Sequence, residues 1–141
     1  MAGGNSKRDL LKSISIFSVC GPNDLVELGQ LLDEVDIPDG KAITREGDSA
    51  GEMFLIASGK ARVERGGQVV DEMGPGGITG EMALISEGRR NATVTADGPV
   101  KVFVAGHREF HSLMDRYPDF RMRVLEGLAK KIRMLEEGAV H

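Results

Sequence analysis

The chain has 141 residues, of which 40% are hydrophobic and 28% charged, a balance typical of one globular domain with its own core. A formal net charge of −4 argues against a nucleic-acid-binding protein, because such a surface would be basic. The single cysteine, Cys20, excludes an internal disulfide. The N-terminus lacks the apolar run of a signal peptide or membrane span, so we expect a cytoplasmic protein.

The N-terminal part of the chain predicts helices. Residues 1–8 are small and polar, and we expect them to be disordered. Residues 9–33 carry apolar side chains at helical spacing, and Pro22 stands where a helix can begin. We expect these N-terminal helices to belong to one domain that covers residues 9–137.

Residues 35–105 change to the pattern of β-strands. Short apolar runs are separated by turn residues, and Gly66-Gly67 predicts a tight hairpin. Further turns are expected at 58–60 and 97–99, where glycine stands beside other turn-forming residues. Several short strands at regular spacing predict a sandwich or a barrel.

The C-terminal part, residues 107–137, returns to helical spacing. The sequence predicts one helix over 107–116 and a final helix that begins at Pro118, since the residue before a proline avoids the helical conformation. His107 and His111 are four residues apart on the first of these helices and could supply half of a metal site. No third ligand is evident, so we do not expect a metal.

The stretch 74–94 combines residue types that suit a phosphate next to a sugar. Its glycines allow backbone N–H groups to approach a ligand, and a short helix starting near Glu81 would direct free N–H groups at an anion. Arg90 can return to the same place and bind phosphate through its planar guanidinium. A carboxylate beside a phosphate repels it, unless the carboxylate faces a hydrogen-bond donor on the same ligand. Glu81 therefore predicts a single phosphate beside a ribose hydroxyl.

This stretch resembles the phosphate-binding cassette of cyclic-nucleotide-binding domains. The resemblance rests on GEMALI at 80–85, followed by RNATV at 90–94. Such domains occur in cAMP receptor proteins, regulatory subunits of cAMP-dependent protein kinase and cyclic-nucleotide-gated channels. The resemblance implies an α+β fold, an antiparallel β-roll of the jelly-roll type over 35–105, flanked by the N-terminal helices and two C-terminal helices. It implies cAMP or cGMP as the ligand, and no cofactor.

The resemblance also assigns roles to single residues. Arg90 and the Ala83 backbone N–H are expected to bind the phosphate, and Glu81 the ribose 2′-hydroxyl. The ligand-binding residues implied in this way are Gly80, Glu81, Met82, Ala83, Leu84, Arg90, Asn91 and Ala92. Apolar side chains of the final helix are expected to form a lid over the purine, namely Leu125, Leu128 and Ile132. Asn91 departs from the small or hydroxyl residue usual after the arginine, which leaves the choice between cAMP and cGMP open. The neighbouring Arg89 is expected to face the other way, into solvent.

We therefore expect a regulatory sensor that shifts its C-terminal hinge and lid helices when a cyclic nucleotide binds. The protein effector is not identified by the sequence, and a homodimer joined through the final helix is left open. No nucleophile–base pair suggests an enzyme. The alternative is a degenerate domain of the same fold that binds no nucleotide and serves as a protein-interaction module. The intact set of Gly80, Glu81, Ala83 and Arg90 argues against it.

Overall fold

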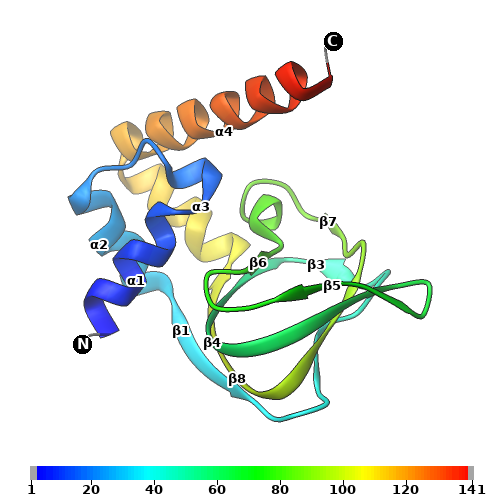
Figure 1. Cartoon of the computed structure of the whole chain (residues 1–141). Coiled ribbons are helices and arrows are strands. Elements are labelled where there is room, and N and C mark those ends of the chain that lie inside the picture. The colour runs from blue at the N-terminus through cyan, green and yellow to red at the C-terminus, as the bar shows by residue number, and fades with distance from the viewer. Residues whose placement is uncertain (1–2, 140–141) are drawn as a thin grey trace. The chain divides into compact units, whose positions relative to one another are not determined.

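The structure is a computed structural model that describes the backbone of residues 3–139 and the side chains of residues 7–138 (Figure 1). Its internal contacts divide the chain into two units. The helical unit comprises residues 1–30 and 112–141, and the roll unit comprises residues 31–111. Each unit is built differently, and the candidate site lies within the roll unit.

The roll unit is an antiparallel sheet structure with one short helix inserted. Its strands are β1 (Asp33–Ile37), β2 (Ala42–Thr44), β3 (Ser49–Ala50), β4 (Glu52–Arg65), β5 (Gln68–Met73), β6 (Ile78–Thr79), β7 (Gly88–Arg89) and β8 (Thr93–Gly106). In the part of the chain that the structure describes, one sheet has the order β1-β8-β4-β5, with β2 also on β8 and β6 also on β4. Strands β3 and β7 form a separate pair. The antiparallel β-roll expected from the sequence is confirmed.

The long strands β4 and β8 pair along most of their length and differ from the prediction at two places. The sequence predicts turns at 58–60 and 97–99, and both are wrong, because the strands run through these positions with register shifts. Gly59 has a φ of 92°, and a Cβ there would collide with the Pro99 carbonyl oxygen. The glycine therefore serves a bulge that brings two backbones close together, which single-sequence turn signals do not distinguish from a turn.

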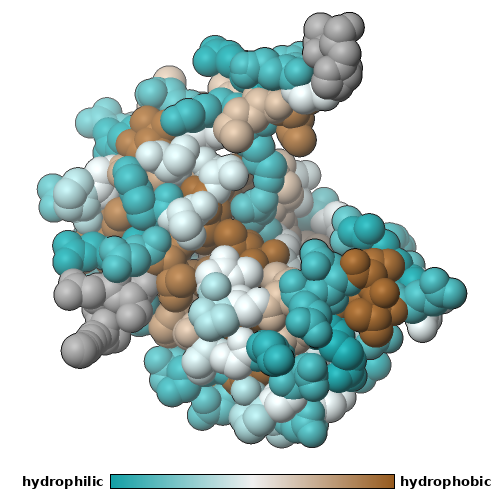
Figure 2. Space-filling model, viewed as in Figure 1, coloured by the Kyte–Doolittle hydropathy of each residue, from teal (hydrophilic) through white to brown (hydrophobic). Residues whose placement is uncertain are grey.

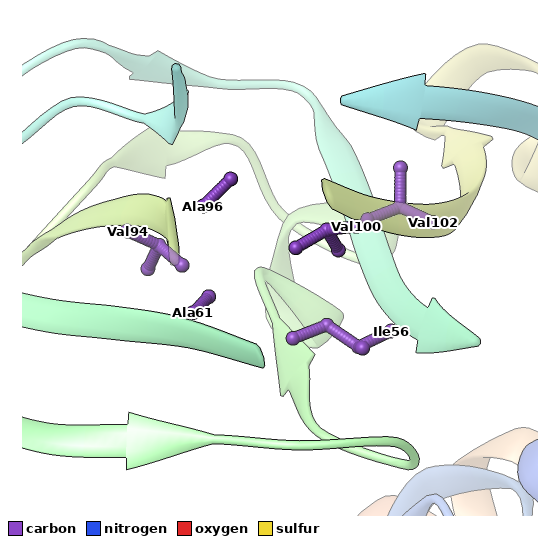
Figure 3. Close-up of a cluster of buried hydrophobic side chains, with 6 residues drawn as sticks. All are labelled: Ile56, Ala61, Val94, Ala96, Val100 and Val102. Carbon is purple, nitrogen blue, oxygen red and sulfur yellow. The ribbon is translucent and has the colours of Figure 1, made fainter. Parts of the chain in front are cut away.

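The core of the roll unit is formed by side chains of the paired strands β4 and β8. Its buried residues are Ile56, Ala61, Val94, Ala96, Val100 and Val102, and Figure 3 shows their side chains directed toward a common interior. Met53 and Leu55 of β4 are buried as well. Burial of neighbouring residues on both faces of β4 agrees with its nearly continuous apolar run.

The hairpin predicted at Gly66-Gly67 is confirmed. These residues join β4 to β5 with φ values of 58° and 80°, the left-handed backbone that tight hairpins require. Val69 and Val70 of β5 are half exposed, and Figure 2 shows a hydrophobic patch over this hairpin.

The helical unit contains α1 (Gly3–Lys12), the 3-10 helix η1 (Ser15–Phe17), α2 (Pro22–Leu31) and α4 (Pro118–Ala139). The helix α3 (His107–Arg116) follows β8 and has the bounds that the sequence predicts. Helices also begin at Pro22 and Pro118 as predicted. The expectation of disorder through residue 8 is wrong from Gly3 onward, and residues 1–2 lie outside the description. Once Leu11 is buried, each further residue adds one backbone hydrogen bond, so the helix extends through polar residues.

Two contacts stabilise the helical unit. Asp24 of α2 is buried and accepts two hydrogen bonds from Arg123 of α4, from Nε at 2.5 Å and from Nη2 at 2.8 Å. Gly127 of α4 lies against the Ile16 backbone, and a Cβ there would collide with the Ile16 carbonyl oxygen. The absence of a side chain at Gly127 therefore lets α4 approach η1 closely. Burial raises the pKa of the nearby Cys20 thiol to about 11, which makes it a packing residue.

Candidate ligand-binding site

Two short strand pairs bring the ends of the cassette together. Strand β6 pairs with β4, with Thr79 opposite Phe54, and so delivers Gly80 beside the start of β4. Strand β7 pairs with β3, with Arg89 opposite Ser49, and so delivers Arg90 to the same place. The intervening residues form the 3-10 helix η2 (Glu81–Leu84), the short coil between β6 and β7 in Figure 1.

Gly80 has a conformation and surroundings that only glycine suits. It is the N-cap of η2, with a left-handed φ of 83° and ψ of 23°. A Cβ at this position would collide with Nη1 of Arg90 and would stand 2.6 Å from the Glu52 carbonyl oxygen. The glycine therefore makes room for the arginine side chain as well as for the turn.

The Arg90 guanidinium is held on one side and lacks an acceptor on the other. Its Nη2 donates to the Glu52 carbonyl oxygen at 2.8 Å, and its Cζ lies 5.5 Å from the centre of the Phe54 ring. Nη1 is buried, and no hydrogen-bond acceptor for it stands within the described residues. Burial lowers the pKa of the Arg90 guanidinium from its ordinary value, and the Glu52 carboxylate opposes that shift. The group stays charged nevertheless.

The Arg90 backbone is also fixed. Its N–H donates to the Asp48 carbonyl oxygen at 2.8 Å, and its carbonyl oxygen accepts from the Gly47 N–H at 2.9 Å. Arg89 is exposed as predicted, but it does not face away from the site. Its Nη1 donates to the Gly47 carbonyl oxygen at 2.9 Å, and the residue lines the same cavity as Arg90. The expectation fails because β7 ends at Arg89, so the alternation of a regular strand does not continue to Arg90.

The cavity beside η2 has a volume of about 270 Å³. It is lined by Ala50, Thr79, Gly80, Glu81, Met82, Ala83, Ser86, Gly88, Arg89, Arg90 and Asn91. Six of the expected ligand-binding residues are therefore together, whereas Leu84 and Ala92 are buried in the core at 0% and 6% exposure. Neither of those two lines the cavity. The binding roles of all these residues stay predictions.

The first turn of η2 differs in one respect from the expected phosphate contact. The Ala83 N–H already donates to the Gly80 carbonyl oxygen at 2.9 Å within the 3-10 turn. A ligand would have to share this donor or displace that bond. Glu81 begins η2, is half-buried and lines the cavity together with Arg90.

The glycines at the start of the predicted motif serve the fold instead of the cavity. The Gly76 N–H donates to the Ile56 carbonyl oxygen at 2.8 Å, and the Ile56 N–H donates to the Gly77 carbonyl oxygen at 2.9 Å. Residues 74–77 do not line the cavity. Within the stretch of glycines, those at 74–77 are therefore not the ones placed to approach a ligand in this cavity, because their backbone bonds to β4 and within its own turn.

Sequence reasoning missed two contacts to the end of η2. Nδ1 of His107 lies 2.8 Å from the Ala83 carbonyl oxygen, and Nε2 of His111 lies 3.1 Å from the Ile85 carbonyl oxygen. Their four-residue spacing indicated a shared helix face and was considered for a metal. Within residues 7–138, no group of three His, Cys, Asp or Glu side chains is placed to hold one.

A larger cavity, of about 460 Å³, lies within the helical unit beside Asp24 and Tyr117. Asp24, the charged group buried at its wall, is already satisfied by Arg123 and by the Gly21 N–H. By contrast, the smaller cavity in the roll unit is lined by Arg90, whose buried Nη1 has no acceptor in the described part of the chain. The chemistry therefore favours the smaller cavity as the ligand site.

The site thus consists of a glycine-capped 3-10 turn that faces a half-buried arginine on an antiparallel β-roll. The family model of the cyclic nucleotide-binding domain matches residues 34–117, and the chain belongs to this family.

Curated relatives include the cyclic nucleotide-gated potassium channel mll3241 of Mesorhizobium japonicum, 35% identical over 83% of this chain and 34% of the channel. The cyclic AMP receptor protein of Thermus thermophilus is 34% identical over 68% of this chain and 47% of that protein. The cAMP-dependent protein kinase regulatory subunit of Yarrowia lipolytica is 33% identical over 74% of this chain and 28% of that protein. The chain thus spans between about a quarter and a half of the length of these relatives.

Solved structures agree on the fold. The N-terminal domain of a transcriptional regulator from Streptomyces coelicolor superimposes with a TM-score of 0.84 at 25% identity, covering 92% of this chain and 96% of that one. A cyclic nucleotide-binding-like protein from Brucella abortus gives a TM-score of 0.72 at 27% identity, covering 77% and 97%. Among the described residues, no helix is both long and apolar enough to cross a membrane.

Proposed function

We propose that this chain is a sensor that binds a cyclic nucleotide in the cavity beside η2. The observation that carries the proposal is that Arg90, which lines this cavity, has a buried Nη1, a charged donor without an acceptor among the described residues. A buried donor left unpaired costs roughly 1–3 kcal/mol, and a ligand phosphate would remove that cost. The match to the cyclic nucleotide-binding family supports a cyclic phosphate.

In this proposal Arg90 donates a hydrogen bond to one phosphate oxygen, and the Glu81 carboxylate accepts a hydrogen bond from the ribose 2′-hydroxyl. The pairing explains why a carboxylate and an arginine share one small cavity, since each has its own group on the ligand. It also limits the charge of the ligand, because a phosphate monoester with two charges would be repelled by Glu81. The similarity to the cyclic AMP receptor protein of Thermus thermophilus supports cAMP as the first ligand to test.

We propose that nucleotide binding in the roll unit is transmitted to the rest of the chain by a change in the position of α3. This helix begins at the end of β8 in the roll unit and continues into the helical unit at Ser112. A nucleotide can shift the position of α3 and α4 only if it binds one arrangement more tightly than the other. We propose that the domain regulates a protein effector and catalyses no reaction itself. We also propose that it works in the cytoplasm.

The face of α4 has two candidate roles. Leu125 and Ile132 are each 49% exposed and Leu135 is 67% exposed, with Leu128 on the same face at spacings of three and four residues. We propose that Leu125, Leu128 and Ile132 cover the purine. The same spacing suits a helix-to-helix seam between two copies of the chain. Sedimentation with and without cAMP separates the roles, because a lid predicts a monomer in both samples and a seam predicts a dimer.

The test is a calorimetric titration of the purified chain with cAMP, cGMP and 5′-AMP. Saturable one-site binding of a cyclic nucleotide, with much weaker binding of 5′-AMP, is expected. No heat with any of the three at two temperatures, from protein that is folded by circular dichroism, would reject the proposal. It would leave the degenerate interaction module as the better account.

A further inference from the structure

The helix η2 is too short to maintain its own position. It contains four residues, and its internal bonds run from the Ala83 N–H to the Gly80 carbonyl oxygen and from the Ile85 N–H to the Met82 carbonyl oxygen. A helix of this length nucleates poorly, and the carbonyl groups at its C-terminal end lack partners within the helix. Whatever satisfies those carbonyl groups also fixes where η2 lies.

Two histidines of α3 supply the partners. Nδ1 of His107 lies 2.8 Å from the Ala83 carbonyl oxygen, and Nε2 of His111 lies 3.1 Å from the Ile85 carbonyl oxygen. Both histidines are half-buried, and their ring centroids are 4.1 Å apart. The two rings form one contact surface that meets the C-terminal end of η2.

The carbonyl partners determine where each imidazole carries its proton. A carbonyl oxygen can only accept, so the ring nitrogen facing it must donate. His107 therefore has its proton on Nδ1 and His111 on Nε2 when both rings are neutral. The two rings are opposite tautomers, which is a specific and measurable consequence of this geometry.

We infer that His107 and His111 are positioning residues that set the affinity for cyclic nucleotide by holding η2 from its C-terminal end. Their action is indirect, because they contact η2 backbone carbonyls and do not line the cavity. Gly80 against Arg90 fixes the N-terminal end of η2, and the histidines fix the other end. Between these two supports lies Glu81, whose carboxylate must meet the ribose hydroxyl. The inference rests on the proposed function.

The connection is reciprocal. If the two hydrogen bonds favour the arrangement of η2 that binds nucleotide, then bound nucleotide must strengthen the two bonds to α3 by the same free energy. The histidines thus offer a direct contact by which occupancy of the cavity reaches the first turns of α3.

The test uses pairs of variants that keep or remove each donor. The amide nitrogen of asparagine can replace Nδ1 of histidine, and that of glutamine can replace Nε2, and neither side chain carries an ionisable proton. His107→Asn and His111→Gln should bind cAMP within about 2-fold of the parent, because one neutral hydrogen bond is retained. His107→Leu and His111→Leu should each bind about 2- to 12-fold more weakly, the range of one net hydrogen bond. Ser112→Leu, an exposed position on the same helix, should bind as the parent does.

A second measurement does not depend on variants or on nucleotide. Nitrogen-15 NMR of the parent at about pH 8, where free imidazole is neutral, should show the Nδ1–H tautomer for His107 and the Nε2–H tautomer for His111. The opposite tautomer at His107 would overturn the inference. So would leucine variants that bind cAMP as tightly as the parent, or asparagine and glutamine variants that bind as weakly as the leucine ones. A parent that binds no cyclic nucleotide while showing both tautomers would overturn the proposed function and the affinity role together, and would leave the hydrogen bonds established.

Discussion

Gly80 and Arg90 fit one another, because a Cβ on Gly80 would occupy the place of the arginine Nη1 atom. The nine residues between them in the sequence are folded so that the turn and the cation line one cavity. Three features depend on this fit: the left-handed N-cap of η2, the burial of the guanidinium, and the position of the donor that we assign to phosphate.

The Gly80→Ala variant tests this fit. A left-handed alanine is strained, so the free energy of unfolding should fall by about 1–3 kcal/mol. Because the new methyl group must also displace the guanidinium, cAMP should bind at least about tenfold more weakly, the equivalent of one charged hydrogen bond. Urea unfolding and calorimetry measure the two effects.

The matched control for that variant is Gly74→Ala. No atom would lie within 4 Å of its new Cβ, and its φ lies outside the left-handed region, so both quantities should stay close to those of the parent. Equal losses in the two variants would show that the effect is general to glycines of this stretch and would contradict the account.

Arg90→Met should separate stability from binding. The substitution removes a buried donor that has no acceptor and keeps an unbranched apolar stem beside Phe54. Without nucleotide, the free energy of unfolding should equal or exceed that of the parent by up to about 2 kcal/mol. The increase in melting temperature that cAMP gives the parent should disappear. A variant clearly less stable than the parent would mean that the Glu52 bond, and not ligand binding, is the main role of Arg90.

The acid sensitivity of the helical unit should depend on Asp24. The hydrogen bond from Arg123 holds the pKa of Asp24 below its ordinary value, with burial acting in the opposite direction. A carboxyl whose pKa is lower in the folded chain stabilises it above the unfolded pKa of about 3.9, and the stabilisation is lost as the pH falls through the folded value. Stability of the parent should therefore fall as the pH is lowered below about 4.

Asp24→Asn should lack that part of the acid dependence and should be less stable than the parent near pH 7, where the parent's carboxylate is charged and paired with Arg123. Urea unfolding curves recorded across the pH range measure the free energy of unfolding of the parent and of Asp24→Asn. Parallel pH profiles for the two proteins would show that Asp24 contributes no acid sensitivity.

Much of the fold was predictable because its signals are local. The prolines at 22 and 118 mark helix starts, the Gly66-Gly67 pair marks a hairpin, and the end of β8 at the start of α3 follows from a change in apolar period. The turns assigned at 58–60 and 97–99 were not predictable, because a glycine that forms a bulge has the same local pattern as one that ends a strand. Only the close approach of Gly59 to Pro99, from the opposite strand, decides between them.

The candidate site was predictable as a motif but not as an arrangement. The order Gly80, Glu81, Arg90 was legible in the sequence, since it resembles a known cassette. The partners of that cassette come from distant segments. Glu52 accepts from the Arg90 side chain across 38 residues, and His107 contacts Ala83 across 24 residues. Every residue has a backbone carbonyl group, so no local sequence pattern shows which of them accepts a hydrogen bond from a distant side chain. These contacts therefore could not be predicted from the sequence.

Asn91 provides a test of purine preference. It is exposed and lines the cavity, and its backbone carbonyl oxygen accepts a hydrogen bond from Nε of Arg65 at 3.2 Å. The family resemblance associates a hydroxyl at this position with guanine. Asn91→Thr should therefore raise the affinity for cGMP relative to cAMP by about 2- to 12-fold, the range of one net hydrogen bond. An unchanged ratio of the two dissociation constants would place purine selection elsewhere.

The most direct test of the central claim is a calorimetric titration of Arg90→Ala with cAMP beside the parent. The control is Arg62→Ala, which removes an arginine of β4 whose ion pairs at 3.6 and 3.7 Å are partly exposed and contribute little. We predict that Arg90→Ala stays folded and binds cAMP about 10- to 150-fold more weakly, as the loss of one charged hydrogen bond requires, while Arg62→Ala binds as the parent does. An Arg90→Ala variant that binds cAMP as tightly as the parent would contradict the assignment of this cavity.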